Sequence, residues 1–268
     1  ELDGVQPVET YKTDKKSKKA EYSIPGLSNG CFMLVEKDGE QFIGHQYIQI
    51  TNENKNVTVD MRSNTPSIKQ FVLEDEKKEL YQSISDQQIG NTVTFRAVGD
   101  IVDMSDYSTY KYTIHDSMDT SLTFQQINSV KLRFVDKDGK IKEETLDSDE
   151  YEVITEELPN GETFQIRISD LKSIYTSHYG EVQEGQKVVY DGSVIVTYTT
   201  ELNESALFKT GQEGINNTAQ LEYSNAPSTL NDSETGYSAE GKATVLTYAL
   251  KVENKDADKK KLKNTKFR

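Results

Sequence analysis

The stretch Asn217-Thr218-Ala219-Gln220-Leu221-Glu222-Tyr223-Ser224-Asn225 alternates apolar and polar residues until it reaches a turn. This period of two predicts a β-strand with one face in the core and the other in solvent. Two upstream stretches have the same character, residues 67–72 with Lys69 and residues 110–116 with Asp116. A lysine, an acid and an asparagine thus stand on three predicted strands, and these are the parts that a self-made isopeptide cross-link needs.

Composition favours a polar all-β protein that does not bind nucleic acid. The formal net charge is -14, and such an acidic surface repels a phosphate backbone. The chain holds 15 tyrosines and no tryptophan, and tyrosine, threonine and valine favour half-buried strands. The sequence contains no run that is long and apolar enough to span a bilayer, so we expect no membrane insertion within this chain.

Residues that carry metal, redox or hydrolytic chemistry are sparse. The single cysteine, Cys31, excludes a disulfide within the chain, and we expect a small buried residue in a strand. His45, His115 and His178 stand among residues that are not metal ligands, so no metal and no cofactor are expected. Asp256-x-Asp258 lacks the central glycine and closing glutamate of a calcium loop. No nucleophile and base have the spacing of a hydrolase, so the chain is not expected to be an enzyme beyond autocatalytic cross-linking.

Short strands separated by turn residues are typical of an antiparallel β-sandwich. A polar run followed by Pro66 predicts a boundary, so residues 1–64, 65–248 and 249–268 are expected to belong to three successive domains. One short helix is expected at 169–175, with Ser169 as its N-cap. In the middle domain the expected strands are 68–73, 92–98, 109–115, 130–135, 151–155, 163–168, 188–201, 218–223 and 242–248.

Five segments, in this order along the chain, resemble the isopeptide-forming domains of Gram-positive pilins and related sortase-anchored surface proteins. Each is similar to one motif of that family. The segments and motifs are 26–35, similar to G-L-x-x-G-Y-Y-L-V; 89–95, similar to I-G-D-T-V-x-F/Y; 107–116 with 121–124, similar to Y-x-x-Y-x-Y-x-x-x-D and a G-L-T-F turn; 217–225, similar to N-T-A-x-L-x-Y-S-N; and 250–267, which looks like the start of a collagen-adhesin B-type (Cna-like) domain.

The resemblance implies Ig-like or Cna-like antiparallel β-sandwich domains in tandem. Residues 1–64 would be the C-terminal part of a preceding sandwich, 65–248 the isopeptide-forming fimbrial domain, and 249–268 the start of a Cna-B-like domain. It also implies an extracellular location on a cell wall or pilus. The implied partners are other pilus or cell-wall components, joined by sortase, and a host extracellular ligand.

The resemblance further implies a chemistry for the trio of side chains. In such domains a buried lysine attacks the side-chain amide of an asparagine, and ammonia leaves. Desolvation lowers the pKa of a lysine so that its amine is nucleophilic, and it raises the pKa of a nearby acid, which then relays protons. By this comparison Asp116 is the acid and Asn217 is the electrophile.

The register of the lysine is the point where this sequence departs from the family. Proline usually stands four residues before the reactive lysine, and four residues after Pro66 stands Gln70, which has no amine. A shift of one residue places Lys69, Phe71 and Leu73 inward together. We therefore predict a Lys69–Asn217 bond. The alternative is a relic site in which Asp116 and Asn217 are hydrogen-bonded without a cross-link.

The predicted function is an extracellular structural subunit of a pilus or cell-wall-anchored surface protein, stabilised by that bond. Shaft pilins carry a sortase-linked lysine where Arg62 stands here, which weakens the interpretation as a polymerising shaft. The alternative is an adhesin module that binds a host ligand through its loops or sandwich face, without a cross-link. Exposed tyrosines would favour the adhesin and buried ones would favour architecture; the candidates are Tyr107, Tyr110, Tyr175, Tyr179 and Tyr190.

Overall fold

The structure is a computed structural model that divides into two compact units, Glu1–Arg62 and Ser63–Arg268. It describes residues 10, 24–38, 41–53, 57, 65–159, 161–180, 187–209, 214–225, 235–248, 253, 255 and 257–261. The domain boundaries expected at 64/65 and 248/249 stay predictions. None of the helices within these described ranges has the length and apolar character needed to cross a membrane.

In the first unit, two strands pair antiparallel. They are β1 (Gly30–Asp38) and β2 (Gln41–Ile50), with Gly30 opposite Ile50. Cys31 lies in β1 as expected, but its side chain is exposed, so the prediction of a buried residue is wrong. Two paired strands form a single layer, and a side chain on such a layer stays in contact with solvent unless a second layer covers it.

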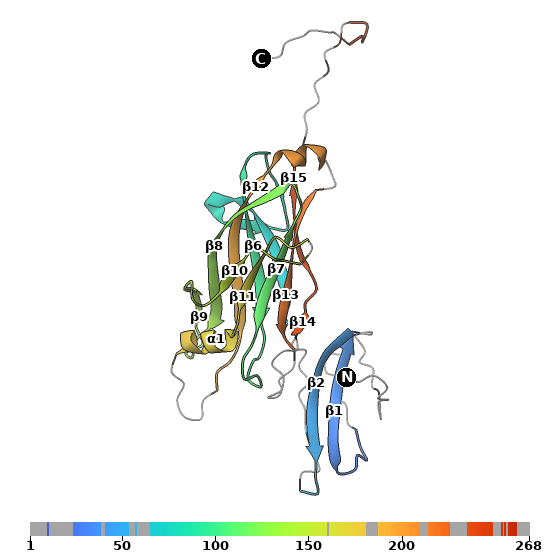
Figure 1. The fold of residues 1–268 in the computed structure, drawn as a ribbon, viewed down its shortest axis with the longest axis vertical. Coiled ribbons are helices and arrows are strands. Elements are labelled where there is room, and N and C mark those ends of the chain that lie inside the picture. Colours follow the sequence, from blue (N-terminus) through green and yellow to red (C-terminus); the bar gives the residue numbers. More distant parts are fainter. Residues whose placement is uncertain are drawn as a thin grey trace. The chain divides into compact units, whose positions relative to one another are not determined.

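The second unit is a sandwich of two sheets (Figure 1). The six-stranded sheet has the order β4 (Leu80–Gln82), β3 (Ile68–Asp75), β6 (Thr92–Ile101), β12 (Gly192–Leu202), β8 (Leu122–Val135) and β9 (Ile141–Thr145). The seven-stranded sheet has the order β10 (Glu152–Ile154), β11 (Phe164–Ile168), β7 (Tyr112–Met118), β13 (Ile215–Ser224), β15 (Gly241–Leu246) and β5 (Ile84–Asp86), with β14 (Thr235–Tyr237) also paired to β13. Two short 3-10 helices, η1 (Glu76–Lys78) and η2 (Glu204–Lys209), follow β3 and β12.

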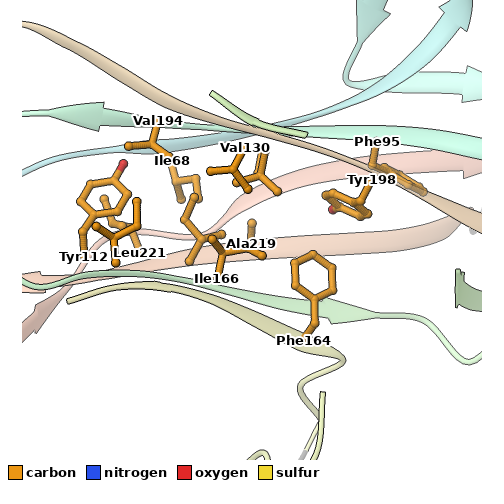
Figure 2. Packing of buried hydrophobic residues seen from close by; sticks show 14 of the residues in the cluster. Ile68, Phe95, Tyr112, Val130, Phe164, Ile166, Val194, Tyr198, Ala219 and Leu221 are labelled. Atoms are coloured by element: carbon orange, nitrogen blue, oxygen red, sulfur yellow. The ribbon is translucent and has the colours of Figure 1, made fainter. Parts of the chain in front are cut away.

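The core lies between the two sheets, where alternate residues of each strand are buried. In β6 the buried residues are every second one from Val93 to Ile101, and β13 follows the same pattern from Ile215. Figure 2 shows side chains of both sheets meeting in this layer. The predicted all-β antiparallel sandwich is confirmed; among the strands that the structure describes, β5 and β15 are the one pair that is parallel.

The one α-helix among the described residues, α1 (Leu171–Tyr179), buries Leu171, Tyr175 and Tyr179 against the sandwich. Its N-cap is Asp170 and not Ser169 as predicted, because Asp170 Oδ1 accepts from the backbone N–H of Ser173 at 3.3 Å. The same carboxylate oxygen accepts from the backbone N–H of Tyr110 at 3.1 Å, which ties the start of the helix to the loop before β7.

The strands β3 and β15 belong to different sheets, yet they run side by side in the same direction. A Cβ atom on Gly241, which begins β15, would lie 2.7 Å from Ile68 O and 3.0 Å from Gln70 N. Further along β15, the backbone N–H of Thr244 donates to Ser83 O, just beyond β4, the strand paired with β3. The absence of a side chain at Gly241 therefore sets how closely the two strands pack.

Candidate functional site

Four polar side chains meet inside the sandwich and form what we call the buried polar cluster. Gln70 of β3 and Tyr198 of β12 come from the six-stranded sheet, and Asp116 of β7 and Asn217 of β13 come from the seven-stranded sheet. Asp116, Asn217 and Tyr198 have no exposed surface, and Gln70 is 3% exposed. The cluster therefore lies in a solvent-free layer.

Strand alternation and register bring these side chains together. In β13 the buried positions are Ile215, Asn217, Ala219 and onward, so Asn217 points inward. Ala219 pairs with Asp116 across β13 and β7, which places Asn217 one inward position away from the acid. In β3 the buried positions are Ile68, Gln70 and Val72, so Gln70 points at the opposite sheet.

The hydroxyl of Tyr198 is the centre of the hydrogen-bond network. It donates to Asp116 Oδ2 at 2.5 Å, and it accepts from Asn217 Nδ2 at 2.8 Å. Gln70 Nε2 also donates to this hydroxyl, and it lies 3.4 Å from Asp116 Oδ2. One phenol thus links an acid and two amides that come from three other strands.

Three oxygens of the cluster have no hydrogen-bond partner among the described residues: Gln70 Oε1, Asp116 Oδ1 and Asn217 Oδ1. All three are acceptors when Asp116 is ionised, so the cluster lacks a donor. Burial raises the pKa of Asp116 to about 8, although hydrogen bonds from Tyr198 and Asn217 oppose the rise. A proton on Asp116 turns one of the three bare acceptors into a donor, so at neutral pH the acid is neutral.

The ring of Tyr198 is packed between aromatic side chains of both sheets, as Figure 2 shows. Its centroid lies 5.8 Å from that of Phe95 and 4.9 Å from that of Phe164. Burial, followed by the charge of Asp116, raises the pKa of Tyr198 well above 10.0, so the phenol keeps its proton. The cluster thus contains a neutral acid, two amides and a neutral phenol, but no amine and no phenolate to act as a nucleophile.

The structure places Lys69 outside this cluster. Lys69 is exposed on β3, whereas Gln70, its neighbour, is buried. The prediction that Lys69, Phe71 and Leu73 point inward together is therefore wrong. The physical reason is the apolar pair Ile68 and Val72, which share a face with Gln70 and belong in the core, and a shift of one residue would turn both toward solvent.

Asp116 and Asn217 are brought together as predicted, while their chemical roles as acid and electrophile stay predictions. Sequence reasoning missed Tyr198, the residue that connects them. The alternation of Val194, Val196 and Tyr198 along β12 was a usable signal for an inward tyrosine. The order of the strands, which decides what that tyrosine meets, was not available from the pattern.

The tyrosines expected to distinguish adhesion from architecture do not form an exposed patch. Tyr110, Tyr175 and Tyr179 are buried, and Tyr107 and Tyr190 are half-buried. Tyr107 and Tyr110 pack edge to face at 4.9 Å, and Tyr175 donates its hydroxyl hydrogen toward the carbonyl oxygens of Val189 and Asp191 at 2.9 and 3.0 Å. These side chains therefore serve the packing of the sandwich.

His115 points away from the cluster, as its neighbouring position to Asp116 on β7 predicts. Its ring nitrogens lie 3.1 Å from Glu162 Oε2 and 3.0 Å from Glu222 Oε2, on the outer face of the seven-stranded sheet. Two residues of earlier predictions lie outside the described residues. They are Arg62, which stands in the place of the sortase-linked lysine, and Asp256, the first residue of the Asp256-x-Asp258 motif. Within the described part of the chain, no group of three or more metal-binding side chains is close enough to hold an ion.

Comparison with known proteins finds similarity at the level of structure. No protein-family model matches the sequence, and no curated protein matches it. A 35 kDa C-terminal fragment of the major pilin GBS80 of Streptococcus agalactiae aligns with a TM-score of 0.51 and 17% identity, over 73% of this chain and 60% of that one.

Two further major pilins align less closely. BcpA of Bacillus cereus aligns with a TM-score of 0.43 and 12% identity, over 81% of this chain and 54% of that one. SpaD of Corynebacterium diphtheriae aligns with a TM-score of 0.43 and 16% identity, over 82% of this chain and 46% of that one. The chain thus spans 60%, 54% and 46% of the three pilin chains. In fold, this chain is similar to a major pilin of a Gram-positive bacterium.

Proposed function

We propose that this chain is a structural part of an extracellular pilus or cell-surface protein of a Gram-positive bacterium. In this proposal, the 65–248 sandwich is held together by packing and by the buried polar cluster, without an isopeptide bond at that site. The similarity in fold to the pilin fragment supports the first part. The position of Gln70 in the cluster supports the second.

The observation that carries the proposal is the geometry around Gln70. Its side chain occupies the inward place on β3 that faces Asp116 and Asn217, where an isopeptide-forming domain needs an amine. A glutamine carries only an amide, whose nitrogen is not a nucleophile at neutral pH. In the proposal, the acid accepts a hydrogen bond from Gln70, the asparagine shares the Tyr198 hydroxyl with Gln70, and no covalent bond joins the two amides.

The Lys69–Asn217 bond predicted from the sequence is not part of the proposal. Lys69 stands on the opposite face of β3, so its amine would have to pass through the strand to reach Asn217. The alternative of a relic site agrees better with the geometry, with one addition: Tyr198 bridges Asp116 and Asn217.

The first experiment is the intact mass of the purified chain. We expect the mass computed from the sequence, in the native protein and, apart from the substitution, in a Lys69→Ala variant. A native mass that is lower by one ammonia would overturn the absence of a cross-link. If that deficit disappeared in Lys69→Ala, the cross-link would be assigned to Lys69.

The surface role needs a separate test in the bacterium that produces the protein. Antibodies raised against the 65–248 sandwich should label intact cells and should detect the protein in the cell-wall fraction. A ladder of high-mass species after wall digestion would indicate sortase-linked assembly with other pilus components. Detection in the cytoplasm alone would contradict the proposal.

A further inference from the structure

The histidine in the last turn of α1 has a carboxylate against each of its ring nitrogens. His178 Nδ1 lies 2.7 Å from Glu144 Oε2, and His178 Nε2 lies 3.0 Å from Glu150 Oε1. Glu144 belongs to β9, the edge strand of the six-stranded sheet, and Glu150 follows β9 along the chain. We call residues 141–150 the β9 strap. One side chain of the helix thus contacts two residues of this strap.

The strap is paired with β8 along one side, from Lys131 opposite Thr145 to Val135 opposite Ile141, and it has few buried contacts of its own. Every residue of β9 is exposed, and Leu146 is the one buried residue of the strap. The turn itself is ordered around Glu150, whose Oε2 accepts from the backbone N–H of Asp147 at 2.8 Å. The contacts of His178 are therefore a large share of what fixes the strap to the helix.

These contacts require a particular protonation state of the ring. An ionised carboxylate only accepts hydrogen bonds, and a neutral imidazole has a single N–H to donate. Only the doubly protonated imidazolium donates to Glu144 and Glu150 at the same time. In the neutral form, one nitrogen lone pair faces a carboxylate oxygen, which is repulsive.

The surroundings of the His178 ring favour its doubly protonated form. The titratable groups that face His178 are Glu144 from β9 and Glu150 from the turn, while β8 presents the uncharged ring of Phe134 at 6.4 Å. The basic side chains Lys131 and Arg133 of β8 lie instead with Glu143, whose side chain points to the opposite face of the sheet from that of Glu144.

The position of His178 at the C-terminal end of α1 adds a further attraction for positive charge. Burial lowers the pKa of His178, but the hydrogen bonds and charges of Glu144 and Glu150 outweigh burial, and the pKa is raised above 6.5. The two carboxylates sit on opposite nitrogens of the ring, so no single metal ion would reach all three groups.

We propose that His178 is a proton-dependent clasp that fastens the β9 strap to α1 in acidic surroundings and loosens it as the pH rises. A group whose pKa is raised by folding contributes stability that is complete below its unfolded value and is lost as the pH rises through its folded value. The helix itself stays in place, because Leu171, Tyr175 and Tyr179 are buried in the core. The strap is therefore the part that loosens: its contact with α1 is lost, while its ladder with β8 remains.

Hydrogen exchange of the full chain, followed by mass spectrometry from about pH 5.5 to about pH 8.5, tests the clasp. After division by the intrinsic rate at each pH, the protection of residues 141–150 should fall on the order of fivefold toward the alkaline end, as expected for a partly exposed ion pair. In His178→Gln the protection should be low and independent of pH. The matched control is His115→Gln, whose ring lies between Glu162 and Glu222 on the other sheet and which should leave the strap unchanged.

Equal protection of the strap at every pH in the native chain, or the same fall in His178→Gln, would overturn the proposal. If His178→Gln fails to fold, an NMR titration of His178 in the native chain decides instead. A doubly protonated ring above its usual pKa of 6.5 supports the clasp, and titration at or below that value overturns it.

Discussion

The hydroxyl of Tyr198 lies 2.5 Å from Asp116 Oδ2, and this contact joins the two sheets at the centre of the sandwich. Gln70 and Asn217 both donate to the same hydroxyl. The hydrogen bonds among these four buried side chains form only in one alignment of the two sheets, so the cluster favours that alignment.

Replacing Tyr198 with phenylalanine should destabilise the sandwich. The change removes the shared hydroxyl and leaves the amide nitrogens of Gln70 and Asn217 buried without that partner. Each nitrogen that stays unpaired costs about 1 to 3 kcal/mol of unfolding free energy. Urea denaturation measures the loss. The matched control is Tyr112→Phe, because Tyr112 is equally buried but makes one long hydrogen bond, 3.3 Å to Asp100 O. Equal losses in the two variants would contradict a special role for Tyr198.

The stability of the sandwich should fall as the pH rises from about 5 to about 8. Folding raises the pKa of Asp116 from 3.8 to about 8, so the folded chain binds the proton more tightly and loses stability as that proton leaves. The difference between these two pKa values corresponds to a change in the free energy of unfolding on the order of 5 kcal/mol at most. In Asp116→Asn the amide keeps a donor at every pH, and this part of the pH dependence should disappear.

The comparison between native chain and Asp116→Asn is made by urea denaturation at each pH. His178 contributes a fall of the same sign, so the difference between the two proteins is the quantity that reports on Asp116. The two should be close in stability near pH 5, and the variant should be the more stable one near pH 8. A difference that does not change with pH would contradict a neutral buried acid.

A lysine in place of Gln70 should create a cross-link to Asn217. Burial lowers the pKa of a lysine, so the new amine would be neutral beside the acid of Asp116 and the amide of Asn217. The nitrogen would bond to Cγ of Asn217, and the side-chain nitrogen of Asn217 would leave as ammonia. The intact mass of Gln70→Lys should therefore be one ammonia below the value computed for that variant.

Two further variants make the result specific. Gln70→Lys combined with Asp116→Ala should keep its full mass, because no acid relays the proton. Gln70→Leu should also keep its full mass while remaining folded by circular dichroism. A folded Gln70→Lys chain that loses no ammonia would show that the cluster does not hold an amine in a reactive position.

A methyl group at position 241 should force β15 away from β3. The Cβ of Gly241→Ala would meet backbone atoms of Ile68, Lys69 and Gln70 at 2.7 to 3.0 Å, and backbone cannot move aside cheaply. We expect a loss of about 1 to 3 kcal/mol in urea denaturation. Gly236→Ala is the control, since its Cβ would meet side-chain atoms of Asn225 and Tyr223 at 3.2 Å, which have more freedom to shift. An equal loss in the control would contradict the close approach of β15 and β3.

Much of the fold could be predicted from alternation alone. Every strand expected between 65 and 248 is present, and most of them have an inward face of apolar residues that the period of two reveals; β10 has no buried residue. The strands β4, β5, β9 and β14 were missed: three of them have three residues each, and all residues of β9, from Ile141 to Thr145, are exposed and show no alternation. The parallel pairing of β5 with β15 was also missed, since pairing depends on the path of the chain between strands.

The candidate site could be predicted only in part. Asp116 and Asn217 were found through a family resemblance, and the structure brings them together. The predicted register of β3, which turns Lys69 inward, is wrong because it leaves the apolar residues Ile68 and Val72 on the outer face. In the structure, Ile68 and Val72 decide the register, and they place Gln70 in the core and Lys69 in solvent.

The side-by-side course of β3 and β15 determines how the sandwich would respond to a pulling force. The strand β3 is the first strand of the sandwich and β15 is its last, and the two strands run in the same direction. A pull on both ends therefore slides each strand along its neighbours and loads many ladder hydrogen bonds together instead of peeling them one by one. If the cluster holds no isopeptide bond, as we propose, this shear resistance sets the rate of forced unfolding without the help of a covalent tether.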